Sequence, residues 1–307
     1  LERVFDVLHV ARSLYTDPFP ISQLVGRGID ALAMNTTQAI APGLRLDAPA
    51  TRQRVVGLIA YLRDEEPSWR GLEGSLRMAR LETTDLVEWR ARDVWFIRPA
   101  ADLETVRNNR DYAIAIDAGR IRDNPRAMAA LDKANLEPRS TDVPRYSRWF
   151  YNEYAYVTRY LNTHFRVIAE RRVTVVSLAA ELYRADHGRW PEELNDLVPA
   201  YLPAVPADPY HDDGRPLGYV IKQGALPGGG DRPLVYFDAG PDDPAQVDKG
   251  PMYGWFRSPA ASVRADVFRQ YRDLARFAGP PLPKAVDDDP GKPDAPGDDR
   301  KDDDPAK

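Results

Sequence analysis

The sequence contains no cysteine and only four histidines, at positions 9, 164, 187 and 211. Without thiols, disulfide frameworks, cysteine nucleophiles and thiolate zinc sites are excluded. With only four histidines spread along 307 residues, we do not expect a metal site built from several histidines. The chain also lacks an apolar run of the roughly 18 to 20 residues that a membrane-spanning helix requires.

Basic residues do not gather in any one segment, although arginine far outnumbers lysine. The formal net charge is −5, and the Asp-rich sequence after Pro283 supplies much of it. Nucleic-acid binding requires Lys and Arg concentrated on one face, so we expect no nucleic-acid partner. The first residue, Leu1, already lies in a helix-like pattern, and we expect contact with a membrane only through a segment upstream of it.

The first 140 residues carry the signals of consecutive α-helices. Apolar residues recur at helical spacing over 1–16, 20–41, 48–65 and 69–89. Short loops between such helices favour antiparallel neighbours. For the second helix we predict that the apolar side faces the core, and this side consists of Ile21, Leu24, Val25, Gly28, Ile29, Leu32 and Ala33.

A longer helix is predicted over 143–187. Its second half is apolar over most of its circumference, which indicates burial on several sides. A narrow polar stripe interrupts it at Thr174, Ser177, Glu181 and Arg184. We therefore expect this helix to be the spine of a domain. Its first half carries an aromatic cluster, made of Tyr146, Trp149, Phe150, Tyr151, Tyr154, Tyr156 and Tyr160.

The helical pattern stops at Gly188. Pro191 followed by two glutamates predicts a short helix over 191–199. Two strands are expected near 217–222 and 233–237, and a further helix over 261–277. Residues 279–307 are predicted to be a disordered acidic tail. The predicted fold is α+β and predominantly helical, with a helical domain over 1–140 and an α+β module over 141–278.

Two motifs admit more than one interpretation. The segment Gly26–Ala31 has the spacing of a dinucleotide-binding fingerprint, but a helical pattern precedes it where the fingerprint requires a strand. Close packing of two helices at these small residues explains the segment better. His187, beside Asp186 and near Glu192 and Glu193, has the residue types of a general base in a hydrolase. Alternatively, it caps the long helix, whose last carbonyls favour a partial positive charge.

Between about 173 and 255 a series of short motifs follows a fixed order. The series consists of a helix ending near Tyr183, then DHGRWP (186–191), YLP (201–203), PADPY (206–210), GYV (218–220), VYFDAGPD (235–242) and GW (254–255). In this order the motifs resemble the globular part of type II secretion major pseudopilins. The resemblance implies a pseudopilin-like module in which a long helix packs on a small antiparallel sheet.

The resemblance also implies a calcium-binding loop after the last strand, which makes calcium the one candidate cofactor. The candidate ligands are Asp242, Asp248, Asp238 and the Ala239 carbonyl. Pseudopilins carry an apolar anchor before the globular part. Here the segment Arg145–Arg172 stands in that place and is rich in charged residues, which argues against a filament-building subunit.

The whole chain resembles a group of bacterial envelope proteins that carry this C-terminal pattern behind a helical region. This resemblance implies an extracytoplasmic location in the cell envelope, with other envelope proteins as partners. We therefore expect a non-enzymatic structural or interaction protein. Two alternatives remain open. One is a hydrolase with a carboxylate and histidine site between the two domains. The other is a helical scaffold that binds peptides through the aromatic cluster at 146–160.

Overall fold

The computed structural model describes residues 1–92, 98–133, 155–222 and 231–237. In chain order, the elements are α1 (Glu2–Leu14), α2 (Pro20–Ile40), the 3₁₀ turn η1 (Ala41–Gly43), α3 (Pro49–Arg63), α4 (Glu66–Ala91), α5 (Arg98–Gly119), α6 (Asn124–Lys133), α7 (Ala155–His187), the 3₁₀ turn η4 (Leu194–Leu197), β1 (Gly218–Lys222) and β2 (Arg232–Tyr236). The predicted class is confirmed, because the fold is predominantly helical with a small two-stranded antiparallel sheet.

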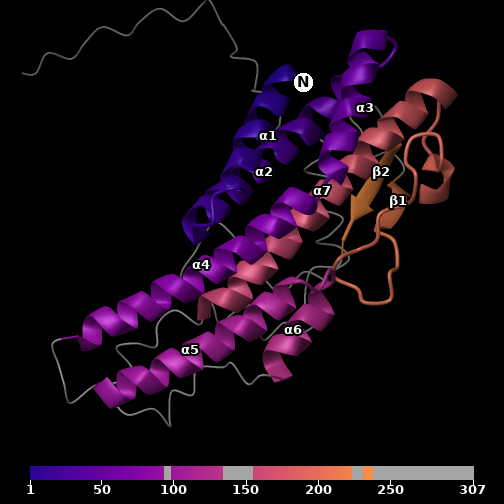
Figure 1. Ribbon diagram of the computed structural model, residues 1–307. Helices are drawn as coiled ribbons and strands as arrows, with labels where there is room; N and C mark the ends of the chain where they lie inside the picture. The colour runs from indigo at the N-terminus through magenta and orange to yellow at the C-terminus, as the bar shows by residue number, and fades with distance from the viewer. Residues whose placement is uncertain (93–97, 134–154, 223–230, 238–307) are drawn as a thin grey trace, which may run out of the picture.

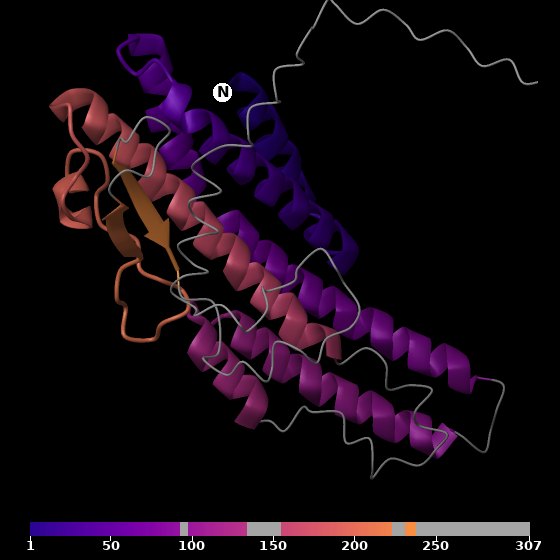
Figure 2. The same ribbon diagram turned by 180° about the vertical axis from the view of Figure 1, so that it is seen from behind.

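Helix α7 is the central element of the molecule (Figures 1 and 2). The α1–α2 pair lies on one side of it and the β1–β2 sheet on the other. Its described part confirms the predicted spine, while residues 143–154 lie outside the described residues. Most of the polar stripe of α7 is interior, since Thr174, Ser177 and Glu181 are buried while Arg184 is half-buried.

Two hydrophobic cores lie along α7. The first joins the C-terminal half of α7, including Val176 and Leu182, to α1, α3, η4 and β2. The second joins the N-terminal half of α7, including Phe165 and Ile168, to α4, α5 and α6. Each core therefore combines residues from before position 140 with residues from α7.

The sheet has the predicted strands in antiparallel register, with Gly218 opposite Tyr236 and Lys222 opposite Arg232. Val235 and Phe237 are buried in the first core. A side chain at Gly218 would place its Cβ 2.3 Å from the ring of Tyr236, so the Tyr236 ring requires glycine at this position. Residues 223–230, between the two strands, lie outside the described residues.

The predicted helix over 191–199 is wrong, because only the 3₁₀ turn η4 forms there. The backbone is extended at Glu193, and the Asp196 carboxylate accepts hydrogen bonds from the backbone N–H groups of Glu192 and Glu193 at 2.8 and 3.2 Å. Val198 is extended as well, because a residue before proline is disfavoured in the helical region. The acidic residues thus cap a single turn.

Two further predictions, the helix over 261–277 and the tail over 279–307, fall outside the described residues. Within the described residues, the helices are all too short or too polar to cross a lipid bilayer.

Gly26 and Gly28 of α2 offer a direct test of helix packing. A Cβ at Gly26 would lie 3.1 to 3.3 Å from Tyr15, Ala11 and Leu14, so α1 crosses α2 closely there, as the small-residue interpretation predicted. A Cβ at Gly28 would meet nothing within 4 Å. We expect Gly28→Ala to stabilise the fold by up to about 1 kcal/mol through helix propensity. Gly26→Ala should lose that gain to overpacking and fall below Gly28→Ala by about 1 kcal/mol or more.

Urea denaturation of both variants at low micromolar concentration, followed by circular dichroism, measures this difference. Equal unfolding free energies for the two variants would contradict the close crossing of α1 and α2 at Gly26.

Candidate functional site

His187 ends α7 and caps it. Its Nδ1 lies 3.0 Å from the carbonyl oxygen of Tyr183, and its ring stacks on the Tyr183 ring with centroids 4.1 Å apart. Gly188 follows with φ of +70°, the left-handed conformation that closes many helices. The capping interpretation of His187 is therefore confirmed.

The carboxylates near His187 bind separate partners. Asp186 accepts hydrogen bonds from Arg52 at 2.7 and 2.5 Å and from the Tyr201 hydroxyl at 2.6 Å, and these bonds lower the pKa of Asp186 to about 2. Glu192 pairs with Arg189 at 2.5 Å, and Glu193 caps η4. All of these acidic side chains are exposed. The structure thus places the proposed hydrolase residues on one surface without making them converge on a shared site.

The other predicted sites are largely beyond the described residues. The candidate calcium ligands Asp238, Ala239, Asp242 and Asp248 fall in that part of the chain. Among the described residues, no group of three or more His, Asp or Glu side chains could hold a metal ion. Tyr160 is the one member of the aromatic cluster whose side chain is described, and it is buried. Its hydroxyl hydrogen bonds to Ser75 at 2.5 Å, so it is not part of an exposed aromatic surface.

The prediction for the faces of α2 is wrong. Its polar residues Gln23, Arg27, Asp30, Thr37 and Gln38 are buried. Four of the residues expected in the core are exposed, with exposed fractions of 67% for Ile21, 43% for Leu24, 48% for Val25 and 63% for Leu32. Gly28 lies among them and is also exposed. We call Ile21, Leu24, Val25, Gly28 and Leu32 the outer face of α2.

The outer face carries no charge. Arg27 and Asp30 are the only charged residues among the 21 of α2, and each is only 2% exposed. The exposed polar residues of the helix are Asn35 and Thr36. A surface helix usually shows the opposite pattern, with charged residues outward and apolar residues inward. A neutral apolar helix face of this kind is typical of a site that another protein covers.

The buried face of α2 forms a polar cluster with α1 and α7. Asp30 accepts a hydrogen bond from the Tyr15 hydroxyl at 2.7 Å and pairs with Arg171 of α7 at 3.4 Å. Arg27 donates to the Tyr160 carbonyl oxygen at 3.2 Å, and its guanidinium carbon lies 4.0 Å from the centroid of the Tyr160 ring. Further along the same seam, Gln38 donates to Thr174 at 2.7 Å.

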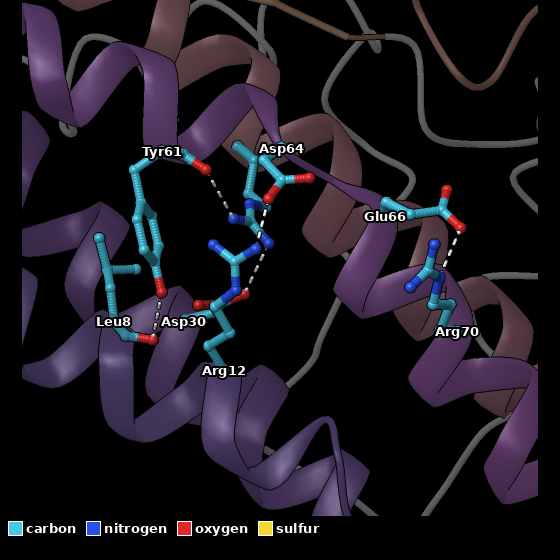
Figure 3. Close-up of polar contacts among 8 residues, drawn as sticks. Leu8, Arg12, Asp30, Tyr61, Asp64, Glu66 and Arg70 are labelled. Atoms are coloured by element: carbon cyan, nitrogen blue, oxygen red, sulfur yellow. Dashed lines mark hydrogen bonds and ion pairs between the residues drawn. The ribbon is translucent and has the colours of Figure 1, made fainter.

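A second set of polar contacts, which extends from buried Leu8 to exposed Asp64, borders this cluster (Figure 3). The Tyr61 hydroxyl donates to the Leu8 carbonyl oxygen at 3.0 Å, and Arg12 pairs with Asp64 beside Asp30. A small hollow is lined by both the buried Asp30–Arg171 pair and the exposed Arg12–Asp64 pair.

The buried cluster has more positive than negative charge, since two guanidinium groups, Arg27 and Arg171, accompany the single carboxylate of Asp30. Burial raises the pKa of Asp30, while Arg171 and the Tyr15 hydrogen bond oppose that rise. His164 is fully buried nearby, with its ring centroid 4.3 Å from that of Trp69. Burial, and then the charges of Arg27, Arg122 and Arg171, lower the pKa of His164 well below its usual range. His164 is therefore neutral in the folded protein at neutral pH.

No protein-family model, curated protein or solved structure matches the chain. The functional interpretation therefore depends on the residues of this chain alone.

The sequence did contain a signal for the orientation of α2. The residues Gln23, Arg27, Asp30, Thr37 and Gln38 share one side of the helix at spacings of 4, 3, 7 and 1. The sequence analysis recognised only the apolar side of this helix, and the rule that apolar sides turn inward held for Ala33 but failed for Ile21, Leu24, Val25 and Leu32. A complementary row on α7, which includes Arg171 and Thr174, was the missing information.

Proposed function

We propose that this chain is a non-enzymatic interaction protein of the cell envelope, in which a rigid helical body presents the outer face of α2 to another protein. The observation that carries the proposal is the pattern of α2 itself. It exposes Ile21, Leu24, Val25 and Leu32 and buries its only two charged side chains. Burying these apolar residues in an interface would be favourable at roughly 25 cal/mol for each Å² removed from water.

The interior supports a rigid presentation of that face. Arg171 of α7 bonds to Asp30 of α2 and to the Tyr61 carbonyl oxygen of α3, at 3.4 and 3.5 Å. Arg172 of α7 binds both carboxylate oxygens of Glu65, at 2.7 and 2.8 Å. Bidentate arginine–carboxylate pairs fix orientation as well as distance. The bonds of Asp30 to Arg171, of Arg27 to Tyr160 and of Gln38 to Thr174 attach α2 to the spine helix.

The ordered motifs between 173 and 255 support a pseudopilin-like module and, with it, an envelope location. The long helix, the break at Gly188 and the two antiparallel strands occur in the order that the resemblance implies. We further propose that the proteins it binds are themselves located in the envelope. Recovery of the natural protein only from the cytoplasmic fraction of the producing cells would contradict the location.

Site-directed photocrosslinking tests the interaction. A photoreactive amino acid placed at Leu32 on the outer face should yield a crosslinked protein adduct in the producing cells. The same amino acid at Ala60, an exposed position in α3, is the matched control and should yield little or none. Both adducts are resolved by gel mobility and identified by mass spectrometry.

The informative quantity is the ratio of the two yields. Equal yields at Leu32 and Ala60, or no adduct at either, would overturn the assignment of α2 as the interaction surface. Introducing a charge should also remove the adduct, so Leu24→Glu combined with the photoreactive residue at position 32 is expected to lower the yield strongly, because burying an unpaired carboxylate is costly.

A further inference from the structure

The spacing of the residues on the outer face of α2 indicates which protein packs against it. Leu24, Gly28 and Leu32 are spaced four residues apart and therefore form one continuous ridge along the helix. The ridge is symmetric, with a leucine on each side of a central glycine. Such a ridge is complementary to a second copy of itself that runs in the opposite direction.

We propose that the chain forms a two-fold symmetric homodimer through antiparallel packing of α2 against α2 of a second copy. This inference rests on the proposed interaction role of α2 and names the partner. The two-fold axis passes beside Gly28, so that Gly28 faces the partner's Gly28. Leu24 then lies beside the partner's Leu32, and Leu32 beside the partner's Leu24.

The glycine at position 28 supports this choice. Among the described residues, a Cβ at Gly28 would meet nothing within 4 Å, so the packing of this part of the chain does not require glycine there. Glycine inside a helix is less stable than alanine there. A second helix that approaches the α2 backbone closely would require it. Gly26, by contrast, already serves the approach of α1.

The lack of charged residues on the outer face of α2 also supports a second copy of the chain as the partner. In a two-fold interface every residue on one subunit is repeated on the other, so a charged face would bring like charges together. The outer face of α2 has no charged residue, because Arg27 and Asp30 are turned into the molecule. Self-association of this face therefore brings no charged residues of α2 together.

The expected affinity follows from the size of the face. A helix of 21 residues is about 31 Å long, and a single helix face is small compared with the roughly 800 Å² that each partner of a stable complex buries. We therefore expect a weak dimer, with a dissociation constant in the micromolar range.

Sedimentation equilibrium of the full chain between about 1 and 300 μM tests the proposal. The wild type should pass from monomer to dimer over this range. Leu24→Lys alone and Leu32→Glu alone should each weaken dimerisation by at least about tenfold, because each buries an unpaired charge. The double variant L24K/L32E should dimerise more tightly than either single variant, since antiparallel packing places each new lysine beside a new glutamate of the partner.

Each outcome is decisive. A wild type that stays monomeric at 300 μM, or a dimer that both single substitutions leave unchanged, would overturn the proposal. Loss of the dimer in both single variants without recovery in the double would overturn the antiparallel register. Unfolding midpoints at low concentration show that each variant is folded, and these exposed positions should tolerate the substitutions.

The absence of cysteine allows a second measurement, because an introduced thiol is the only one in the chain. When Leu24→Cys and Leu32→Cys chains are mixed under mild oxidation, the mixed disulfide should form faster than either homodisulfide. Ala60→Cys is the control, because its rate of disulfide formation reflects random collisions between chains. A monomeric, uncrosslinked protein that still gives a photoadduct with a different protein at position 32 would overturn the homodimer and leave the interaction role of α2 intact.

Discussion

Asp30→Ala is expected to lower the free energy of unfolding by about 3–5 kcal/mol. The substitution leaves Arg171 buried without the carboxylate that now lies 3.4 Å away, and Arg27 remains buried nearby. It also removes the acceptor of the Tyr15 hydroxyl bond at 2.7 Å. Since whole domains are stable by only about 5–15 kcal/mol, this loss is large. Urea denaturation at pH 7, followed by circular dichroism, measures it.

The double variant Asp30→Leu with Arg171→Met separates charge from packing. Replacing both members of a buried ion pair by apolar residues is often neutral or stabilising. We therefore expect the double variant to recover most of the stability that Asp30→Ala and Arg171→Met each lose. Arg70→Ala is the surface control, because Arg70 pairs with Glu66 on the exposed side of α4 (Figure 3). Its effect should stay below about 0.5 kcal/mol. A loss from Asp30→Ala no larger than this control would contradict the buried ion pair.

The second large effect concerns pH and His164. The pKa of His164 is lowered well below its usual range in the folded protein, by burial first and by neighbouring arginines second. In the unfolded chain the same imidazole takes up a proton near pH 6.5. Below that pH the unfolded state binds a proton that the folded state excludes, so stability falls as pH falls. The contribution is about 1 kcal/mol between pH 6.5 and 5.5, and it is fully retained above pH 7.5.

His164→Leu removes this contribution. We expect the difference in unfolding free energy between wild type and variant to shift by about 1 kcal/mol between pH 6.5 and 5.5, in favour of the variant. Because His9, His187 and His211 are present in both proteins, their titrations cancel in the difference. Urea midpoints at pH 7.5, 6.5 and 5.5 give the profile. Parallel profiles for the two proteins would show that His164 is protonated to the same extent in the folded and unfolded states.

The helices and strands could be predicted because their signals are local. Pro20 and Pro49 begin α2 and α3 at the positions that the sequence indicated, and Gly188 ends α7. The strands at 218–222 and 232–236 were also predicted, near 217–222 and 233–237, from their residues alone. The error at 191–199 has a local cause too, since Pro199 prevents Val198 from adopting the helical conformation.

The orientation of α2 could not be predicted in the same way. Its polar side is stabilised by partners far away in the chain, with Asp30 and Arg171 separated by 141 residues and Arg27 and Tyr160 by 133. The free energy that favours burial of this polar side comes from contacts between α2 and α7. The sequence of α2 alone shows a polar face and an apolar face but does not indicate which of them packs against the rest of the chain.

Both stability predictions concern α7, because Asp30 pairs with Arg171 of this helix and His164 belongs to it. Helix α7 passes through both hydrophobic cores. A helix of 33 residues is about 50 Å long, and its two halves contribute to separate hydrophobic clusters. Because helix formation is cooperative, neither core can lose its segment of α7 without exposing the end of the other segment. We therefore expect the two cores to melt as one cooperative unit. We expect that a force applied to α2 by a bound protein is resisted along the whole length of α7. The β1–β2 sheet on the opposite side of α7 then shares in this resistance.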